Sequence, residues 1–240
     1  MPKRVDAGEA ALMALLRAIV SRDRRQVASL LRESPELAQR AASAGATRAV
    51  STPYYFEEIA HYVYAGDTAL HIAAAAYERD VAESLVTRGA NPGARNRRGA
   101  EPLHYAADGL PGAPSWNPDA QAATIAYLIG AGADPNSPDK SGVAPLHRAV
   151  RTRGAAAVRA LLAHGADPLR RNASGSTPLH LAVQTTGRGD SGSPASRVQQ
   201  EMVIALLLDH GARSTDTDAR GKTVEEAAAS ERLKELLRRS

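Results

Sequence analysis

The sequence contains no cysteine, a single tryptophan, a single phenylalanine and no hydrophobic run of membrane-spanning length. Without cysteine, the chain has no disulfides, no thiolate metal sites and no thiol nucleophile. Lys3 and Arg4 precede an apolar stretch, but Glu9 and Arg17 interrupt it, so we expect neither a signal peptide nor a membrane-spanning helix. A cytoplasmic location is the resulting expectation.

The most prominent feature that is present is a repeated four-residue phrase, each copy of which begins two residues after a glycine. The copies are Thr68-Ala-Leu-His71, Glu101-Pro-Leu-His104, Ala144-Pro-Leu-His147 and Thr177-Pro-Leu-His180. The four glycines are 33, 43 and 33 residues apart, and Gly221 follows 46 residues after the last of them. Two of these intervals therefore equal one unit, and two equal that unit with an insertion.

Each unit is predicted to form two helices. Pro102, Pro145 and Pro178 stand in the phrase, where the first turn of a helix tolerates proline because that amide would be unpaired anyway. Each unit ends in a Gly-Ala pair, as at Gly89, which suits a helix stop. The second helices carry apolar stripes at Val81, Leu85 and Val86, at Ile125, Leu128 and Ile129, at Val158, Leu161 and Leu162, and at Val203, Leu206 and Leu207. A single unit cannot bury its stripe, so neighbouring units must stack.

The 33-residue period and the phrase together resemble the ankyrin repeat. The resemblance implies an all-α solenoid of stacked helix-turn-helix units with short finger turns, which contacts partners through these fingers and the concave surface beside them. Glu101 and Ala144 replace the threonine of the family pattern, so we expect the threonine–histidine hydrogen bond to be missing in the second and third repeats. Those units should still form, because one helix cap is worth only about 1 kcal/mol.

We expect one elongated domain over residues 1–240. Two apolar runs joined at residues 21–23 predict a helical pair before the first phrase, which resembles the degenerate first unit of many bacterial ankyrin proteins. The predicted parts are an N-terminal capping pair at 9–40, an aromatic-rich inserted segment at 41–65, repeats at 66–98, 99–141, 142–174 and 175–220, and a polar C-terminal cap at 221–240.

The inserted segment holds five of the nine aromatic residues of the chain. One set of apolar residues falls at the spacing of one helical face, and it comprises Tyr55, Phe56, Ile59, Tyr62 and Val63. This spacing predicts an extra helix packed over the N-terminal end of the stack. Tyr54 and Tyr64 lie off that face and are candidate contact residues.

The positions that flank the repeat glycines are the partner contacts that the resemblance implies, and here they lean positive. Residues 142–220 carry a net charge of +4, although interspersed aspartates argue against a nucleic-acid stripe. We expect a monomer that binds another protein with an acidic surface; the alternative, an ordinary solvated face in an arginine-rich chain, stays open. The candidate contacts are Arg97, Arg98, Lys140, Arg151, Arg153, Arg220, Lys222, Trp116 and Tyr105.

Two insertions, at 108–119 and 186–194, are predicted to lie between the first and second helices of alternate repeats. Because packed helices are separated by about 8–10 Å, loops two repeats apart are expected roughly 20 Å from each other on one edge, close enough to form one bipartite site. Trp116 in the first insertion is a candidate binding hot spot. The alternative is that Trp116 folds back onto neighbouring helices and pins its loop.

Six of the seven histidines occupy repeat positions, and the sequence shows no phosphate-binding glycine loop and no nucleophile elbow. The seventh, His61, lies four residues after Glu57, a helical spacing that supplies two metal ligands at most. The sequence therefore favours a non-catalytic protein-binding module without a cofactor. A metal-dependent enzyme or metal sensor that uses Glu57 and His61 is the alternative.

Overall fold

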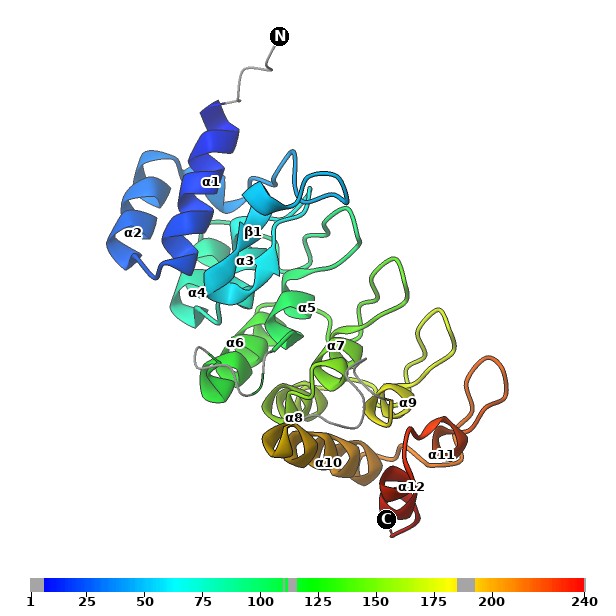
Figure 1. The fold of residues 1–240 in the computed structure, drawn as a ribbon. Coiled ribbons are helices and arrows are strands. Elements are labelled where there is room, and N and C mark those ends of the chain that lie inside the picture. Colours follow the sequence, from blue (N-terminus) through cyan, green and yellow to red (C-terminus); the bar gives the residue numbers. More distant parts are fainter. Residues whose placement is uncertain (1–6, 110, 112–115, 185–192, 240) are drawn as a thin grey trace. The chain divides into compact units, whose positions relative to one another are not determined.

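The computed structural model describes residues 7–109, 111, 116–184 and 193–239. Within these residues, the chain forms twelve α-helices and one two-stranded hairpin. Figure 1 labels the helices along the chain. The chain divides into two compact units, residues 1–106 with 123–133 and residues 107–122 with 134–240. In a repeat array each repeat contacts its neighbours only, so local units of this kind are natural. The single domain over residues 1–240 stays a prediction.

The first unit begins with the expected helical pair, α1 (Ala7–Val20) and α2 (Arg24–Glu33). Asp23 ends the turn between them and caps α2, since its carboxylate accepts a hydrogen bond of 2.9 Å from the amide of Gln26. A 3₁₀ turn, η1 (Pro35–Ala38), follows. The buried apolar residues of the pair are Leu12, Leu15, Leu16, Ile19, Val27 and Leu31. The predicted N-terminal pair is thus present.

The first complete repeat consists of α3 (Ala69–Ala75) and α4 (Arg79–Thr87). His71 joins it to the next turn, because its Nδ1 accepts from the amide of Thr68 at 3.1 Å and its Nε2 lies 3.1 Å from the carbonyl oxygen of Ala100. These partners require a neutral ring with its proton on Nε2. Burial lowers the pKa of His71, which agrees with that state.

The next two helices are α5 (Pro102–Ala107) and α6 (Pro118–Gly130), and α6 contributes residues to both units. Of the predicted apolar stripes in this unit, Val81 and Leu85 on α4 are buried, as are Ile125 and Leu128 on α6. Val86 is only half-buried. The stripes therefore form part of the core, as predicted.

The inserted segment is not the predicted helix. It forms η2 (Thr52–Tyr54), β1 (Tyr55–Phe56), η3 (Glu57–Ile59) and β2 (His61–Tyr62), with the two strands antiparallel. Ala60, with a left-handed φ of 49°, breaks any helix between the strands. Aromatic residues favour strands. Hydrogen bonds between β1 and β2 provide partners for backbone N–H and C=O groups that would be paired within a helix.

Backbone hydrogen bonds join distant parts of this segment and connect it to the start of the first repeat. The amide of Ala46 donates to the carbonyl oxygen of Val63 at 2.7 Å, and the amide of Ala42 donates to the carbonyl oxygen of Asp67 at 2.7 Å. A Cβ on Gly45 would lie 2.5 Å from the carbonyl carbon of Tyr64, so this close approach of two backbones requires glycine. Phe56 and Val63 are buried, whereas Tyr55 and Tyr62 are exposed.

The second unit contains six further helices. They are α7 (Pro145–Arg151), α8 (Ala155–Ala163), α9 (Pro178–Ala182), α10 (Pro194–Asp209), α11 (Val224–Ala227) and α12 (Glu231–Arg239). Thr223 and Glu226 form a reciprocal capping box at the start of α11. The expected apolar stripes of α8 and α10 bury Val158, Leu161, Leu162, Val203 and Leu207.

The threonine–histidine hydrogen bond varies among the repeats as predicted. The hydroxyl of Thr68 lies 3.0 Å from Nδ1 of His71, and that of Thr177 lies 2.8 Å from Nδ1 of His180. Ala144 has no hydroxyl, yet its amide still donates to the ring of the repeat histidine, as does the amide of Glu101. The backbone bond alone is therefore enough to start these helices.

The finger turns share one local design. In the first unit, Asn96 Oδ1 accepts hydrogen bonds from the amides of Arg98 (2.8 Å) and Ala100 (3.1 Å), and Gly99 between them has a φ of 78°. The same pair of side-chain bonds is made in the second unit by Asp139, Asn172 and Asp218. These bonds hold the residues at the tip of each turn in a fixed conformation.

Candidate functional site

A pocket of about 570 Å³ lies in the first unit, between the inserted segment and the finger turn that follows α4. Its lining residues are Ala46, Thr47, Arg48, Ser51, Tyr62, Tyr64, Arg97 and Arg98. We call it the arginine–tyrosine pocket. Two of the nine predicted contacts, Arg97 and Arg98, line it, as does Tyr64, which was named from the sequence as a candidate contact residue.

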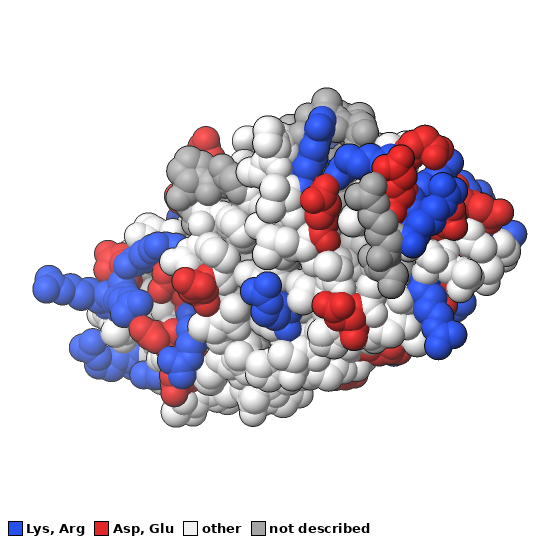
Figure 2. Space-filling model, turned by 90° about the horizontal axis from the view of Figure 1, so that it is seen from below, with Lys and Arg blue, Asp and Glu red and all other residues white. Residues whose placement is uncertain are grey.

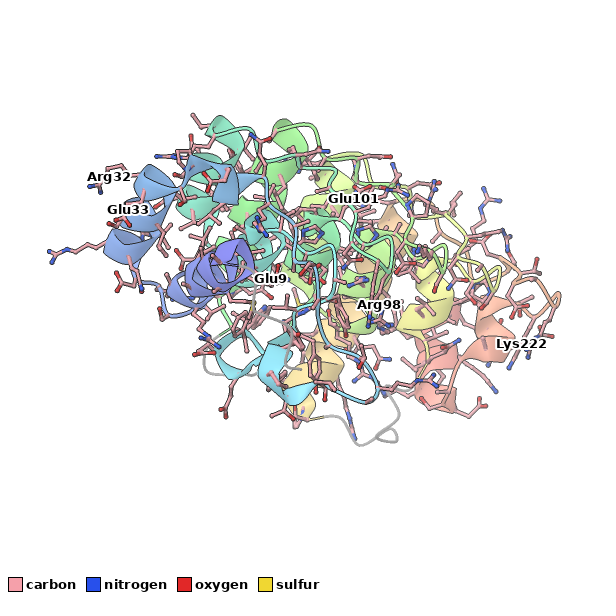
Figure 3. The ribbon with its side chains drawn as sticks, turned by 90° about the horizontal axis from the view of Figure 1, so that it is seen from above. Glu9, Arg32, Glu33, Arg98, Glu101 and Lys222 are labelled. Atoms are coloured by element: carbon pink, nitrogen blue, oxygen red, sulfur yellow. The ribbon has the colours of Figure 1, made fainter. Side chains whose placement is uncertain are left out.

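Tyr64 positions both finger arginines. The Cζ atom of Arg98 lies 4.8 Å from the centroid of the Tyr64 ring, and that of Arg97 lies 5.6 Å from it. Arg97 also donates a hydrogen bond from Nη2 to the carbonyl oxygen of Ala46, which connects the finger to the inserted segment. Arg98 extends from the turn between α4 and α5 (Figure 3).

The pocket is basic, because Arg48, Arg97 and Arg98 are all exposed and none of its lining residues is acidic. In the part of the chain that the structure describes, no carboxylate forms an ion pair with any of these three arginines. Arg95 on the same turn differs, since its Nε lies 3.0 Å from the Glu101 carboxylate. The three charges of the pocket are therefore uncompensated within the described residues.

A buried polar network lies beneath this surface and joins the finger to the inserted segment. The carboxylate of Asp67 is fully buried and accepts hydrogen bonds from the hydroxyl of Tyr105 (2.8 Å), Nδ2 of Asn96 (2.8 Å) and the amide of Tyr64 (2.7 Å). Because every contact is charge-assisted, the network is expected to be rigid. The Asp67 carboxylate thus binds both the side chain of Asn96, which fixes the finger turn, and the backbone amide of Tyr64, whose ring lines the pocket.

Tyr105 is consequently not a partner contact, and that prediction is wrong. Only 1% of the residue is exposed, and its ring stacks on His61 at a centroid distance of 4.3 Å. Its hydroxyl donates a hydrogen bond to the Asp67 carboxylate. The side chain on α5 turns inward because the buried carboxylate needs a donor. Its role is to support the pocket from within.

Tyr64 and Tyr62 line the pocket, and the ring of Tyr55 on the neighbouring strand β1 lies next to that of Tyr62. The Tyr55 and Tyr62 rings have centroids 4.8 Å apart, and those of Tyr62 and Tyr64 are 6.4 Å apart. Tyr55 is 41% exposed and Tyr62 is 37% exposed. Arg48 and Tyr62 were not predicted as site residues, and the aromatic spacing had placed Tyr62 on a buried helical face.

Comparison with known families agrees with this architecture. The family model described as ankyrin repeat matches residues 65–97 and 174–222, and that described as ankyrin repeats in many copies matches residues 128–182. The chain belongs to the ankyrin-repeat family. The all-α repeat fold is thereby confirmed, and ankyrin repeats are generally protein–protein interaction modules and typically not enzymes. No curated protein matches the chain.

The remaining basic candidates lie in the second unit of this ankyrin-repeat chain. Lys140, Arg220 and Lys222 are exposed on finger turns, and Lys222 can be followed in Figure 3. Arg151, the last residue of α7, is also exposed. Arg153 is only 9% exposed and occupies the turn after α7 with a φ of 59°, so its prediction as a surface contact is wrong.

Both insertions lie between the first and second helices of their ankyrin repeats, as predicted. Trp116 is half-buried, and its Nε1 donates at 3.0 Å to the side chain of Gln121, which in turn donates to the carbonyl of Asp108 at 3.1 Å. The tryptophan therefore folds back onto the start of α6. The predicted bipartite site falls mainly on residues 112–115 and 185–192, which lie outside the described residues.

The proposed metal pair is not supported by the structure. Glu57 begins η3 and His61 lies in β2, so the helical spacing that would direct both side chains to one metal does not exist. Nδ1 of His61 is 3.0 Å from the Tyr62 carbonyl oxygen, and its ring is stacked on Tyr105. In the described parts of the chain, no group of three His, Asp or Glu residues is arranged to hold a metal ion.

Charges elsewhere are mixed. On the face seen in Figure 2, Lys and Arg side chains are interspersed with Asp and Glu side chains. No helix among the described residues is both long and apolar enough to cross a bilayer.

Proposed function

We propose that this ankyrin-repeat chain is a non-catalytic protein-binding module, acting as an adaptor, scaffold or regulator, whose partner presents an acidic surface. The observation that carries the proposal is the arginine–tyrosine pocket, where Arg48, Arg97 and Arg98 face solvent without an acidic partner among the described residues. Arginine binds carboxylates through two parallel hydrogen bonds, and arginine and tyrosine are enriched among binding hot spots.

Preorganisation supports the same proposal. The side chains that shape the pocket are held by the Asp67 network, by the Tyr64 ring and by the Asn96 turn before any partner arrives. A rigid surface loses little conformational entropy on association. The exposed finger residues Lys140 and Arg220 are further contacts in this proposal, together with Arg151 and Lys222.

A pair of charge-reversed variants tests the role of the pocket. Arg48→Glu with Arg98→Glu places two acidic side chains in it without disturbing the Arg97 bond to Ala46. The matched control is Arg25→Glu with Arg32→Glu on α2, which makes the same change in net charge on exposed residues that do not line the pocket. Arg25 is near the start and Arg32 near the end of this helix, so their effects on the helix dipole oppose each other.

The measurement is affinity capture from lysate of the source cells with wild type and both variants, at low and high salt. We expect the wild type and the control variant to capture one or more proteins that the pocket variant does not capture. High salt should weaken this capture, because the attraction is electrostatic. Equal capture by all three proteins would exclude the pocket as the binding surface. Circular dichroism and thermal unfolding of each variant separate this loss from misfolding.

A further inference from the structure

We propose that the arginine–tyrosine pocket receives a phosphorylated side chain of the partner protein. This inference rests on the proposed function and specifies its ligand. Its basis is the combination of three arginines without carboxylate partners among the described residues, an aromatic wall and hydroxyl groups, all around one pocket. The pocket is assembled from the inserted segment and a finger turn, which the Asp67 carboxylate joins.

Charge favours a phosphoryl group over a carboxylate. Arg48, Arg97 and Arg98 bring three positive charges to the pocket, and its lining contains no acidic residue. A carboxylate carries a single negative charge, whereas a phosphorylated side chain carries about −1.5 to −2 at neutral pH. The dianion compensates more of the mutual repulsion of the arginines, and its attraction grows with each of them.

Hydrogen-bonding capacity leads to the same ligand. The ring of Tyr64 supports both guanidinium groups, which leaves the N–H edge of Arg98 available; Arg97 uses only Nη2 for Ala46. A phosphoryl group has three strong acceptor oxygens, and guanidinium groups bind it bidentately. The hydroxyl of Ser51 at the pocket wall is a further donor for the remaining acceptor sites.

Size is also suitable. At about 570 Å³ the pocket falls within the range of about 300–1,000 Å³ that ligand sites occupy. A single carboxylate would fill a small part of this space. A phosphorylated side chain with the adjacent residues of its peptide would fill more, and the exposed ring of Tyr62 provides an apolar wall for those residues.

The test uses the full chain and four degenerate peptide pools with a fixed central residue: phosphoserine, phosphothreonine, phosphotyrosine or glutamate. Binding is measured by fluorescence anisotropy, with inorganic phosphate as competitor. We expect at least one phosphorylated pool to bind about tenfold more tightly than the glutamate pool, because the second negative charge acts close to three arginines. Arg48→Gln with Arg98→Gln should remove this preference, and the control Arg25→Gln with Arg32→Gln should keep it.

A variant of Tyr64 provides a second measurement. Tyr64→Phe keeps the ring and should keep the preference, whereas Tyr64→Ala removes the ring that supports both arginines and should reduce it; the hydrogen bond to Asp67 uses the Tyr64 backbone amide and remains in both. Thermal unfolding of each variant identifies any that fails to fold.

Four outcomes overturn the inference. If the glutamate pool binds as tightly as the phosphorylated pools, the phosphoryl preference is wrong and the acidic-partner proposal stands. If no pool binds while lysate capture still depends on the pocket, the phosphorylated-peptide inference alone fails. If inorganic phosphate binds and no pool does, the pocket serves a small phosphorylated compound. If neither the pools nor lysate proteins depend on the pocket arginines, both proposals fail.

Discussion

Replacing Tyr105 by phenylalanine should destabilise the first unit out of proportion to the single oxygen that it removes. The hydroxyl lies 2.8 Å from both oxygens of the fully buried Asp67 carboxylate and accepts a hydrogen bond of 2.9 Å from Nδ2 of Asn96. The substitution removes one donor from the carboxylate and leaves one N–H of Asn96 without its acceptor.

The magnitude follows from the charge and the burial. A hydrogen bond to a charged group contributes about 1.5–3 kcal/mol, and an unsatisfied buried donor adds to the loss. Asp67 retains the bonds from Asn96 and the Tyr64 amide, which limits the effect. We therefore expect the free energy of unfolding to fall by about 2–3 kcal/mol.

Urea unfolding followed by circular dichroism measures this loss. The matched control is Tyr127→Phe on α6, which removes the same oxygen from a half-buried tyrosine without a described hydrogen-bond partner and keeps the ring near Arg79. The control should stay within about 0.5 kcal/mol of wild type. A loss below about 0.5 kcal/mol for Tyr105→Phe would refute the reasoning that the network is a stabilising element.

Two further predictions concern pH and the inserted segment. Burial lowers the pKa of His71 and of His147, so the unfolded chain binds protons first as the pH falls; stability should be full above pH about 6.5 and decrease below it by at most about 1.4 kcal/mol per pH unit for each histidine. Urea midpoints that stay constant between pH 7.5 and 5.5 would contradict this. Gly45→Ala should increase the rate of hydrogen exchange at the amide of Ala46, because the new Cβ clashes with the facing backbone. Gly130→Ala is the control: nothing lies within 4 Å of its new Cβ, so its effect on stability should be neutral or stabilising and it should not increase exchange at Ala46. Equal exchange at Ala46 in the two variants would refute the close-packing argument.

The helical pairs could be predicted from the sequence because their signals are local. The repeated phrase, the helix-ending glycines and the stripes such as Val158 and Leu161 act within a few residues of one another. The inserted segment was wrongly predicted, because its aromatic spacing matches a helical face whereas contacts between distant residues determine its structure. The left-handed Ala60 and the long-range bond from Ala46 to Val63 decide for the hairpin.

The site divides in the same manner. Arg97 and Arg98 were identifiable as finger residues, since the repeat register alone places them beside Gly99. Their chemical environment was not identifiable, because Arg48 and Tyr64 reach them from a segment tens of residues earlier in the chain.

The sequence by itself thus determined the repeat architecture, the family and the positive finger of the first unit. Only the tertiary structure decided that Tyr105 is buried on Asp67, that Trp116 folds onto Gln121, and that Arg97 shares a pocket with Tyr62. The physical reason is that helix periodicity and turn chemistry depend on neighbouring residues, whereas burial, ion pairing and pocket formation depend on which distant segments pack together.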